Sequence, residues 1–275
     1  MKYKEIISQY AEKGYARTMS TEEEQALSSR TWYLPHHPVF HPKKPGKLRV
    51  VFDAAAKFKG KSLNSSLLTG PDLLNSLPGV IIRFRTGRVA IVADIEAMFH
   101  QVKVSEMDAD SLRFLWKDDI FSTDPPYTMQ MLVHVFGAKD SPTCANYALR
   151  VTALDNYQRF DGLTYESVLK SFYVDDLLKS VNTEEMAISL CKELREIAKC
   201  GGFRLTKFLS NCKGVIDSLP PSEISPHMIL ELNGEIIERT LGIYWETNHD
   251  LFTFRFNFKE APMTKRGILQ VKFSV

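Results

Sequence analysis

The 275-residue sequence has little cysteine and little net charge, and it lacks long apolar runs. No hydrophobic stretch approaches the length of a membrane span, so we expect no membrane partner. The four cysteines lack the paired spacing of a metal site and no signal sequence precedes them. We therefore expect reduced thiols in an intracellular, cytoplasmic protein. The formal net charge is only +2, so a nucleic-acid surface must come from local basic patches.

The sequence does contain an acidic pair between two apolar runs. Residues 171–180 read Ser-Phe-Tyr-Val-Asp-Asp-Leu-Leu-Lys-Ser, which predicts a β-hairpin with Asp175 and Asp176 as its tight turn. Neighbouring carboxylates repel each other and lose hydration at such a place, so a shared cation favours their ionised forms. Hard oxygen ligands suit Mg2+, whereas a solvated acidic turn is the simpler alternative.

A third acid strengthens the metal interpretation. Residues 89–93 form a nearly continuous apolar run, typical of a strand covered on both faces, and Asp94 follows at its end. A buried acid needs a partner there, and a metal shared with Asp175 would supply one. By contrast, Asp118 and Asp119 have polar flanks and no matching strand, so we interpret that pair as solvated.

The motif Tyr-Val-Asp-Asp at residues 173–176, downstream of a strand that ends in Asp94, resembles the palm of a reverse transcriptase. Residues 34–39, 49–54 and 93–102 resemble the Pao/BEL group of long-terminal-repeat retrotransposons in particular. The resemblance implies an α/β (α+β) polymerase right-hand fold. In this fold, helices back an antiparallel palm sheet, the fingers are rich in β-structure, and the thumb is here largely absent.

The resemblance also implies an RNA-directed DNA polymerase that adds dNTPs to a primer on an RNA or DNA template. Asp94, Asp175 and the backbone carbonyl of Ile95 would bind two Mg2+ ions, for which Mn2+ is a substitute, and Asp176 would assist or hold the turn. In a full-length element, the partners would be protease, ribonuclease H and integrase domains.

Other positions match residues of the family that contact the nucleotide. Arg49, together with Lys43 or Lys44, would bind the triphosphate, because guanidinium groups clamp phosphate oxygens and lysines act as point charges. Phe99 would pack under the sugar and exclude a ribose 2′-hydroxyl. Lys207 would lie near the leaving pyrophosphate. The alternatives are exposed surface lysines and an ordinary core phenylalanine.

Two segments resemble the sites for template and primer. Gly137, Ser141 and Pro142 match the template and nucleotide-binding turn, with Ser141 as the N-cap of a helix that runs toward Asp155. The positions that match the primer grip are Leu241, Gly242 and Tyr244. The aromatic residues of this second segment would serve equally well in a core.

We expect an N-terminal helical segment over residues 1–30, fingers and palm over 31–248, and the start of a truncated thumb or connection region over 249–275. Prolines between residues 35 and 45 predict a hairpin-like flap. A helix is expected to end at Pro78-Gly79, and another to run between Thr183 and Gly201. Two other functions stay open: a remnant that only binds nucleic acid, and a metal-dependent nuclease that uses the same three acids.

Overall fold

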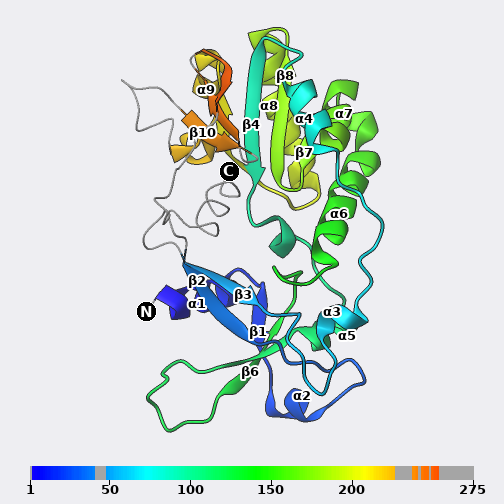
Figure 1. Cartoon of the computed structure of the whole chain (residues 1–275), viewed down its shortest axis with the longest axis vertical. Helices are drawn as coiled ribbons and strands as arrows, with labels where there is room; N and C mark the ends of the chain where they lie inside the picture. The colour runs from blue at the N-terminus through cyan, green and yellow to red at the C-terminus, as the bar shows by residue number, and fades with distance from the viewer. Residues whose placement is uncertain (1, 41–47, 227–236, 241–242, 248, 254–275) are drawn as a thin grey trace, which may run out of the picture.

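The computed structural model describes residues 2–40, 48–226, 237–240, 243–247 and 249–253. It is a mixed α/β structure with antiparallel sheets, arranged as two lobes that lie one above the other in Figure 1. We call the lobe around the β7-β8-β4-β9 sheet the palm, and the lobe around the β1-β6-β5 sheet the fingers. Within the described residues, every helix is too short or too polar to cross a membrane.

The palm sheet is built around β4 (Val89–Ile95), which lies between β8 (Asp176–Val181) and β9 (Leu205–Ser210). The short strand β7 (Phe172–Tyr173) pairs with the outer edge of β8. Ile91, Ala93 and Ile95 pack into the larger palm core, whereas Ala90 and Val92 pack into a second core on the opposite face. Both faces of β4 are covered, which explains its continuous apolar sequence and confirms the predicted strand.

Three helices cover one face of this sheet, α6 (Ser141–Asp155), α7 (Gly162–Lys170) and α8 (Glu184–Cys200). The expected α8 is confirmed, because the Thr183 side chain accepts a hydrogen bond from the amide of Met186 and Gly201 ends the helix. The sheet and these helices together enclose the larger palm core.

The other face carries α4 (Leu77–Phe84) and the small sheet of β10 (Ile237–Thr240), β11 (Ile243–Glu246) and β12 (Leu251–Thr253). The expectation that a helix ends at Pro78-Gly79 is wrong, because α4 begins there. Proline fits the first turn of a helix, where its missing N–H costs nothing. The Asn75 side chain donates hydrogen bonds to the carbonyls of Leu169 and Phe172, which ties the non-helical segment before α4 to the palm.

The fingers combine the sheet of β1 (Ala16–Thr18), β6 (Tyr127–Met131) and β5 (Arg113–Trp116) with the ribbon of β2 (His36–Phe40) and β3 (Leu48–Phe52). Helix α1 (Lys2–Glu12) packs on this lobe, and β1 pairs with β6, so the N-terminal segment contributes an edge strand. The ribbon is antiparallel, as expected of the flap, and its tip lies outside the described residues. Shorter helices are α2 (Thr21–Gln25), α3 (Leu63–Ser66), α5 (Glu106–Ala109) and, in the palm, α9 (Lys213–Asp217).

Candidate active site

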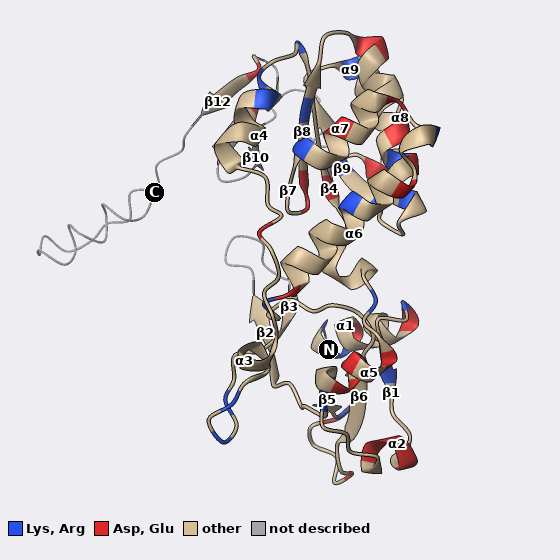
Figure 2. Cartoon of the chain, turned by 90° about the vertical axis from the view of Figure 1, so that its right-hand side faces the viewer, with Lys and Arg blue, Asp and Glu red and all other residues tan. Residues whose placement is uncertain are grey.

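Three aspartates meet at one end of the palm sheet. Asp94 on β4 lies directly opposite Asp176 on β8, so their side chains lie on the same face of the sheet. The backbone amide of Ile95 donates a 2.9 Å hydrogen bond to the carbonyl of Asp175, which fixes the hairpin turn beside the end of β4. Figure 2 shows acidic residues in red at the ends of these strands that point toward the fingers. Residues far apart in the sequence thus form one acidic site.

The predicted turn of the hairpin is wrong by one residue. Tyr173 pairs with Asp176, so the two turn residues are Val174 and Asp175, and Asp176 is the first residue of β8. Val174 has a φ of 56°, an unusual value for a β-branched residue. The backbone strain places Asp175 at the tip while Asp176 stays in register with Asp94. The two adjacent acids therefore differ in backbone structure, since Asp175 lies in the turn and Asp176 lies in the strand.

The surroundings of Asp175 disfavour its negative charge. Burial is the main cause that raises the pKa of this carboxyl, and the neighbouring Asp94 carboxylate raises it further. A backbone hydrogen bond and the positive charges of Lys207 and Arg49 act in the opposite direction. A bound cation would relieve both the loss of hydration and the repulsion from Asp94.

Lys207 is the nearest cation to this site. Its Nζ lies 2.8 Å from Oδ2 of Asp94, and the ion pair is partly exposed. Lys207 lies in a β-bulge, because Val92 pairs with Leu209 but Asp94 pairs with Thr206, so Lys207 and Phe208 together lie opposite Ala93. Its φ of 55° is also in the left-handed region. The resemblance places this lysine near the pyrophosphate, whereas the structure pairs it with an acid of the site.

The three aspartates do not form a closed metal cluster in this arrangement. Across the described residues, the one trio of His, Cys, Asp and Glu side chains whose ligand atoms all lie within 4.8 Å of each other is elsewhere, at His134, Asp140 and Cys144. The donor set still fits Mg2+, which takes one or two carboxylates and completes its shell with water and substrate phosphates. A cation at Asp94 would take the place of the Lys207 ammonium.

The flap contributes one described candidate for phosphate binding. Arg49 lies on β3 opposite Val39 and is exposed, and its charge acts on Asp175 across the gap between the lobes. An exposed guanidinium can bind phosphate oxygens in a bidentate manner, so Arg49 stays a candidate for phosphate binding beside the acidic site. Lys43 and Lys44 lie outside the described residues.

Phe99 lies in the 3-10 helix of Met98–Gln101 that follows β4. Its ring packs on that of Phe136, with 4.6 Å between the ring centroids. This contact restricts the phenylalanine ring, as a steric barrier requires, and it is equally compatible with a core role.

The turn before α6 depends on Gly137. Its φ is 112°, and a Cβ added there would overlap the carbonyl oxygen of Phe52. The Asn64 side chain holds this turn, because it donates to the carbonyl of Gly137 and accepts from the amide of Lys139, both at 2.9 Å. The turn is therefore fastened to the fingers at two points.

The start of α6 differs from the expectation. Asp140 is the N-cap residue, without a side-chain cap, and Ser141 is the first helical residue with Pro142 next to it. The fully buried Ser141 hydroxyl donates a 2.8 Å hydrogen bond to the carbonyl of Val135. Serine thus fixes the turn internally, and α6 ends at Asp155 as expected.

Of the expected primer grip, Leu241 and Gly242 lie outside the described residues. Tyr244 lies on β11, where the backbone alone is described. The neighbouring Trp245 is a core residue that packs its ring edge-on against Phe84 and donates a hydrogen bond to Asp250. Trp245 therefore packs the small sheet against α4.

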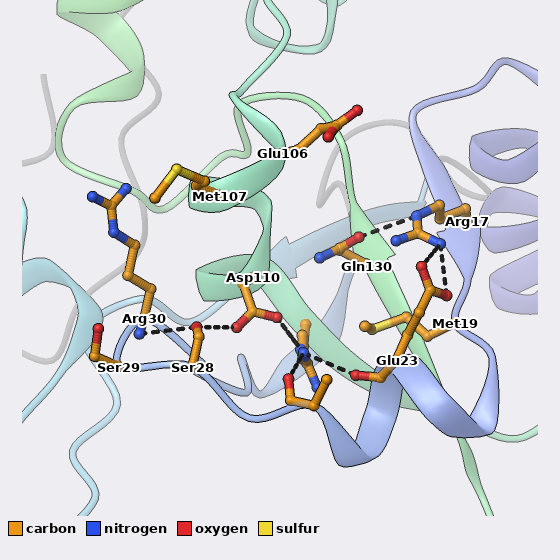
Figure 3. Close-up of a pocket in the computed structure, with 12 residues that line it drawn as sticks. Arg17, Met19, Glu23, Ser28, Ser29, Arg30, Glu106, Met107, Asp110 and Gln130 are labelled. Carbon is orange, nitrogen blue, oxygen red and sulfur yellow. Dashed lines mark hydrogen bonds and ion pairs between the residues drawn. The ribbon is translucent and has the colours of Figure 1, made fainter.

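Sequence reasoning missed a buried charge in the fingers. Figure 3 shows residues that line a cavity in the fingers, Asp110 among them. The cavity has a volume of about 340 Å³, and Arg113, which also lines it, pairs with Asp110. The Arg113 side chain is 2 % exposed and also donates hydrogen bonds to backbone carbonyls of Glu23, Glu24 and Ala26. Because the donors of this guanidinium are engaged, the residue fastens α2 to β5.

The fold of this chain is similar to that of a solved reverse transcriptase. The structure of a foamy viral protease-reverse transcriptase in complex with double-stranded DNA matches 95% of this chain with a TM-score of 0.60 and 14% sequence identity. The match spans 37% of that larger chain. No protein-family model and no curated protein matches the sequence.

Proposed function

We propose that this chain is the fingers and palm of an RNA-directed DNA polymerase, a reverse transcriptase of the Pao/BEL type. The observation that carries the proposal is the meeting of Asp94 with Asp175 and Asp176 at the end of the palm sheet. The motifs between residues 34 and 245 support the Pao/BEL assignment. The fold similarity to a DNA-bound reverse transcriptase supports the polymerase architecture.

In this proposal, Asp94, Asp175 and the carbonyl of Ile95 hold two Mg2+ ions, or Mn2+, and Asp176 keeps the hairpin in place. Such ions would supply the Lewis acidity that lowers the pKa of a primer 3′-hydroxyl and stabilises the charge of an in-line transition state. Without them, Lys207 neutralises Asp94. Once displaced from Asp94, its ammonium would be the proton donor for the leaving pyrophosphate.

Arg49 and either Lys43 or Lys44 bind the triphosphate of the incoming dNTP, where fixed positive charge stabilises the leaving group. Phe99 excludes the ribose 2′-hydroxyl, because a ring held by Phe136 cannot move aside without loss of packing. In this proposal, positively charged side chains bind the phosphates of the nucleotide, and the Phe99 ring contacts its sugar.

The remaining residues would position the template and primer. Gly137, Ser141 and Pro142 form the turn for the template and nucleotide, and the primer-grip residues are Leu241, Gly242 and Tyr244. Protease, ribonuclease H and integrase domains of a polyprotein are the proposed partners.

Primer extension on poly-rA/oligo-dT with Mg2+ tests this proposal. The wild-type chain should incorporate dTTP. Asp175→Asn should reduce incorporation by about 100-fold or more, because the metal ion that stabilises the charge of the transition state would lose one of its ligands. Asp119→Asn is the matched control. Its carboxylate accepts a hydrogen bond from the amide of Phe121 in an exposed loop, which an asparagine oxygen also accepts.

Three outcomes contradict the proposal. Equal incorporation by wild type and Asp175→Asn would refute the metal assignment. Binding of the hybrid without incorporation by the wild type would favour a remnant that only binds nucleic acid. Primer shortening in place of growth would indicate a nuclease.

A further inference from the structure

A second cluster of metal-ligating side chains lies where α6 meets the fingers, away from the three aspartates. His134 comes from the segment after β6, Asp140 is the N-cap of α6, and Cys144 lies one helical turn later. The helical hydrogen bond from the amide of Cys144 to the carbonyl of Asp140, at 2.9 Å, puts these two side chains on one face. The sequence does not reveal this cluster, because Cys144 is not part of a closely spaced cysteine pair of the kind that marks a metal site.

The spacing of these groups suits a tetrahedral metal ion. One ligand atom from each residue lies within 4.8 Å of the other two, and His134 Nδ1 lies 3.8 Å from Asp140 Oδ2. Metal–ligand bonds of about 2.0–2.3 Å place neighbouring ligand atoms of a tetrahedral zinc roughly 3.3–3.8 Å apart. Small side-chain rotations would therefore close the site.

One polar atom of the cluster is left without a protein partner in the described part of the chain. The other oxygen of Asp140, Oδ1, is buried and has no hydrogen-bond partner among the described residues. Buried carboxylate oxygens without a partner are costly, and a coordinated cation removes that cost. The His134 ring supplies a nitrogen ligand, which is the commonest metal ligand in proteins.

We propose that His134, Asp140 and Cys144 bind one Zn2+ ion. Imidazole nitrogen, thiolate sulfur and carboxylate oxygen are all zinc ligands, whereas thiolate is a poor ligand for Mg2+. His134, Asp140 and Cys144 line a cavity of about 340 Å³ together with Lys103, Ser105 and Asp108. A water molecule in this cavity would supply the fourth ligand.

The ion would fasten the turn at residues 135–139 to α6. This turn lies between His134 on one side and Asp140 and Cys144 on the other, so the metal would close a short loop around it. Its fingers side is held by the Asn64 side chain. The zinc proposal stands independently of the polymerase proposal, because it requires no activity.

Metal titration of the whole chain tests the site. The protein is stripped of metal, and Co2+ or Zn2+ is added in the presence of excess Mg2+, which occupies sites made of oxygen ligands. We expect one equivalent of bound Zn2+ by mass spectrometry and, with Co2+, a thiolate-to-metal charge-transfer band. Asp175→Asn should leave both signals intact, which separates this site from the catalytic one.

Cys144→Ser should abolish the cobalt band and weaken Zn2+ binding by at least the 10–100-fold that loss of an outer-shell partner costs. Cys200→Ser is the matched control, because this exposed cysteine lies outside the cluster. If Cys144→Ser does not fold, Asp140→Asn should weaken binding while it keeps the shape of the side chain. A wild-type protein without the band, or a Cys144→Ser protein that retains one tightly bound Zn2+, would overturn the proposal.

Discussion

Gly137→Ala should be one of the most damaging single-methyl additions in this chain. The residue has a φ of 112°, and the new Cβ would overlap the carbonyl oxygen of Phe52 in the fingers. That carbonyl belongs to the backbone of β3, so it cannot rotate away as a side chain does. Either the turn before α6 or the ribbon that carries Arg49 must therefore move.

The expected loss of unfolding free energy has two causes, backbone strain and steric overlap, and a comparison with a second glycine separates them. Gly60 has a φ of 80° but nothing within 4 Å of its added Cβ, so Gly60→Ala meets backbone strain alone, about 1–3 kcal/mol. Gly137→Ala meets similar strain and an overlap that costs about 1–3 kcal/mol more. The expected loss of unfolding free energy is about 2–6 kcal/mol for Gly137→Ala.

Denaturant unfolding followed by circular dichroism measures both variants, and thermal melts should show about 2–4 °C for each kcal/mol. Because the displaced turn also carries Ser141, Gly137→Ala should lower primer extension below the level of Gly60→Ala at temperatures where both are folded. Equal destabilisation of the two variants would refute the reasoning, since it would mean that the contact with Phe52 adds nothing.

Three further predictions concern the acidic site and its neighbours. Mg2+ at 100 times its dissociation constant should stabilise the wild type by about 2.7 kcal/mol in thermal melts, and Asp94→Asn should remove most of this effect. Burial raises the pKa of Asp175, so its ionised form costs stability once the pH exceeds 3.8, the ordinary value. Without Mg2+, Asp175→Asn should therefore melt higher than wild type at pH 7, and an advantage that persists below pH 3.8 would contradict this cause. Phe99→Val should raise the use of rNTPs relative to dNTPs by roughly 10-fold or more in single-nucleotide extension, and an unchanged ratio would assign Phe99 to the core.

Local patterns predicted the central strand of the palm and the presence of the β7–β8 hairpin. The apolar run before Asp94 identified the central strand. Both faces of this strand are covered, so nearly all of its residues are apolar and the pattern can be recognised without knowledge of the strands beside it. The ends of α8 followed from Thr183 and Gly201, since caps are local interactions. By contrast, Pro78 is compatible with both the end and the beginning of a helix, and only the contacts of Asn75 with the α7–β7 region decide between them.

The details of the acidic site were harder to predict. The position of the hairpin turn depends on how Asp176 pairs with Asp94, a contact between distant segments. The reach of Lys207 to Asp94 depends on a bulge in β9, and a bulge has no reliable sequence signal when it lacks glycine. His134 and Cys144 likewise meet through the path of the turn before α6, and their spacing in the chain gives no indication of a cluster.

The pairing of Lys207 with Asp94 makes cation binding an exchange. A divalent ion bound at Asp94 would have to displace an ammonium that is tethered to the chain and does not diffuse away, so its affinity would include the cost of this displacement. Without such an ion, the same ammonium reduces the repulsion between the Asp94 and Asp175 carboxylates. Under the proposed function, Lys207 would therefore set the Mg2+ concentration at which the site fills, and shortening or neutralising this side chain would lower that concentration.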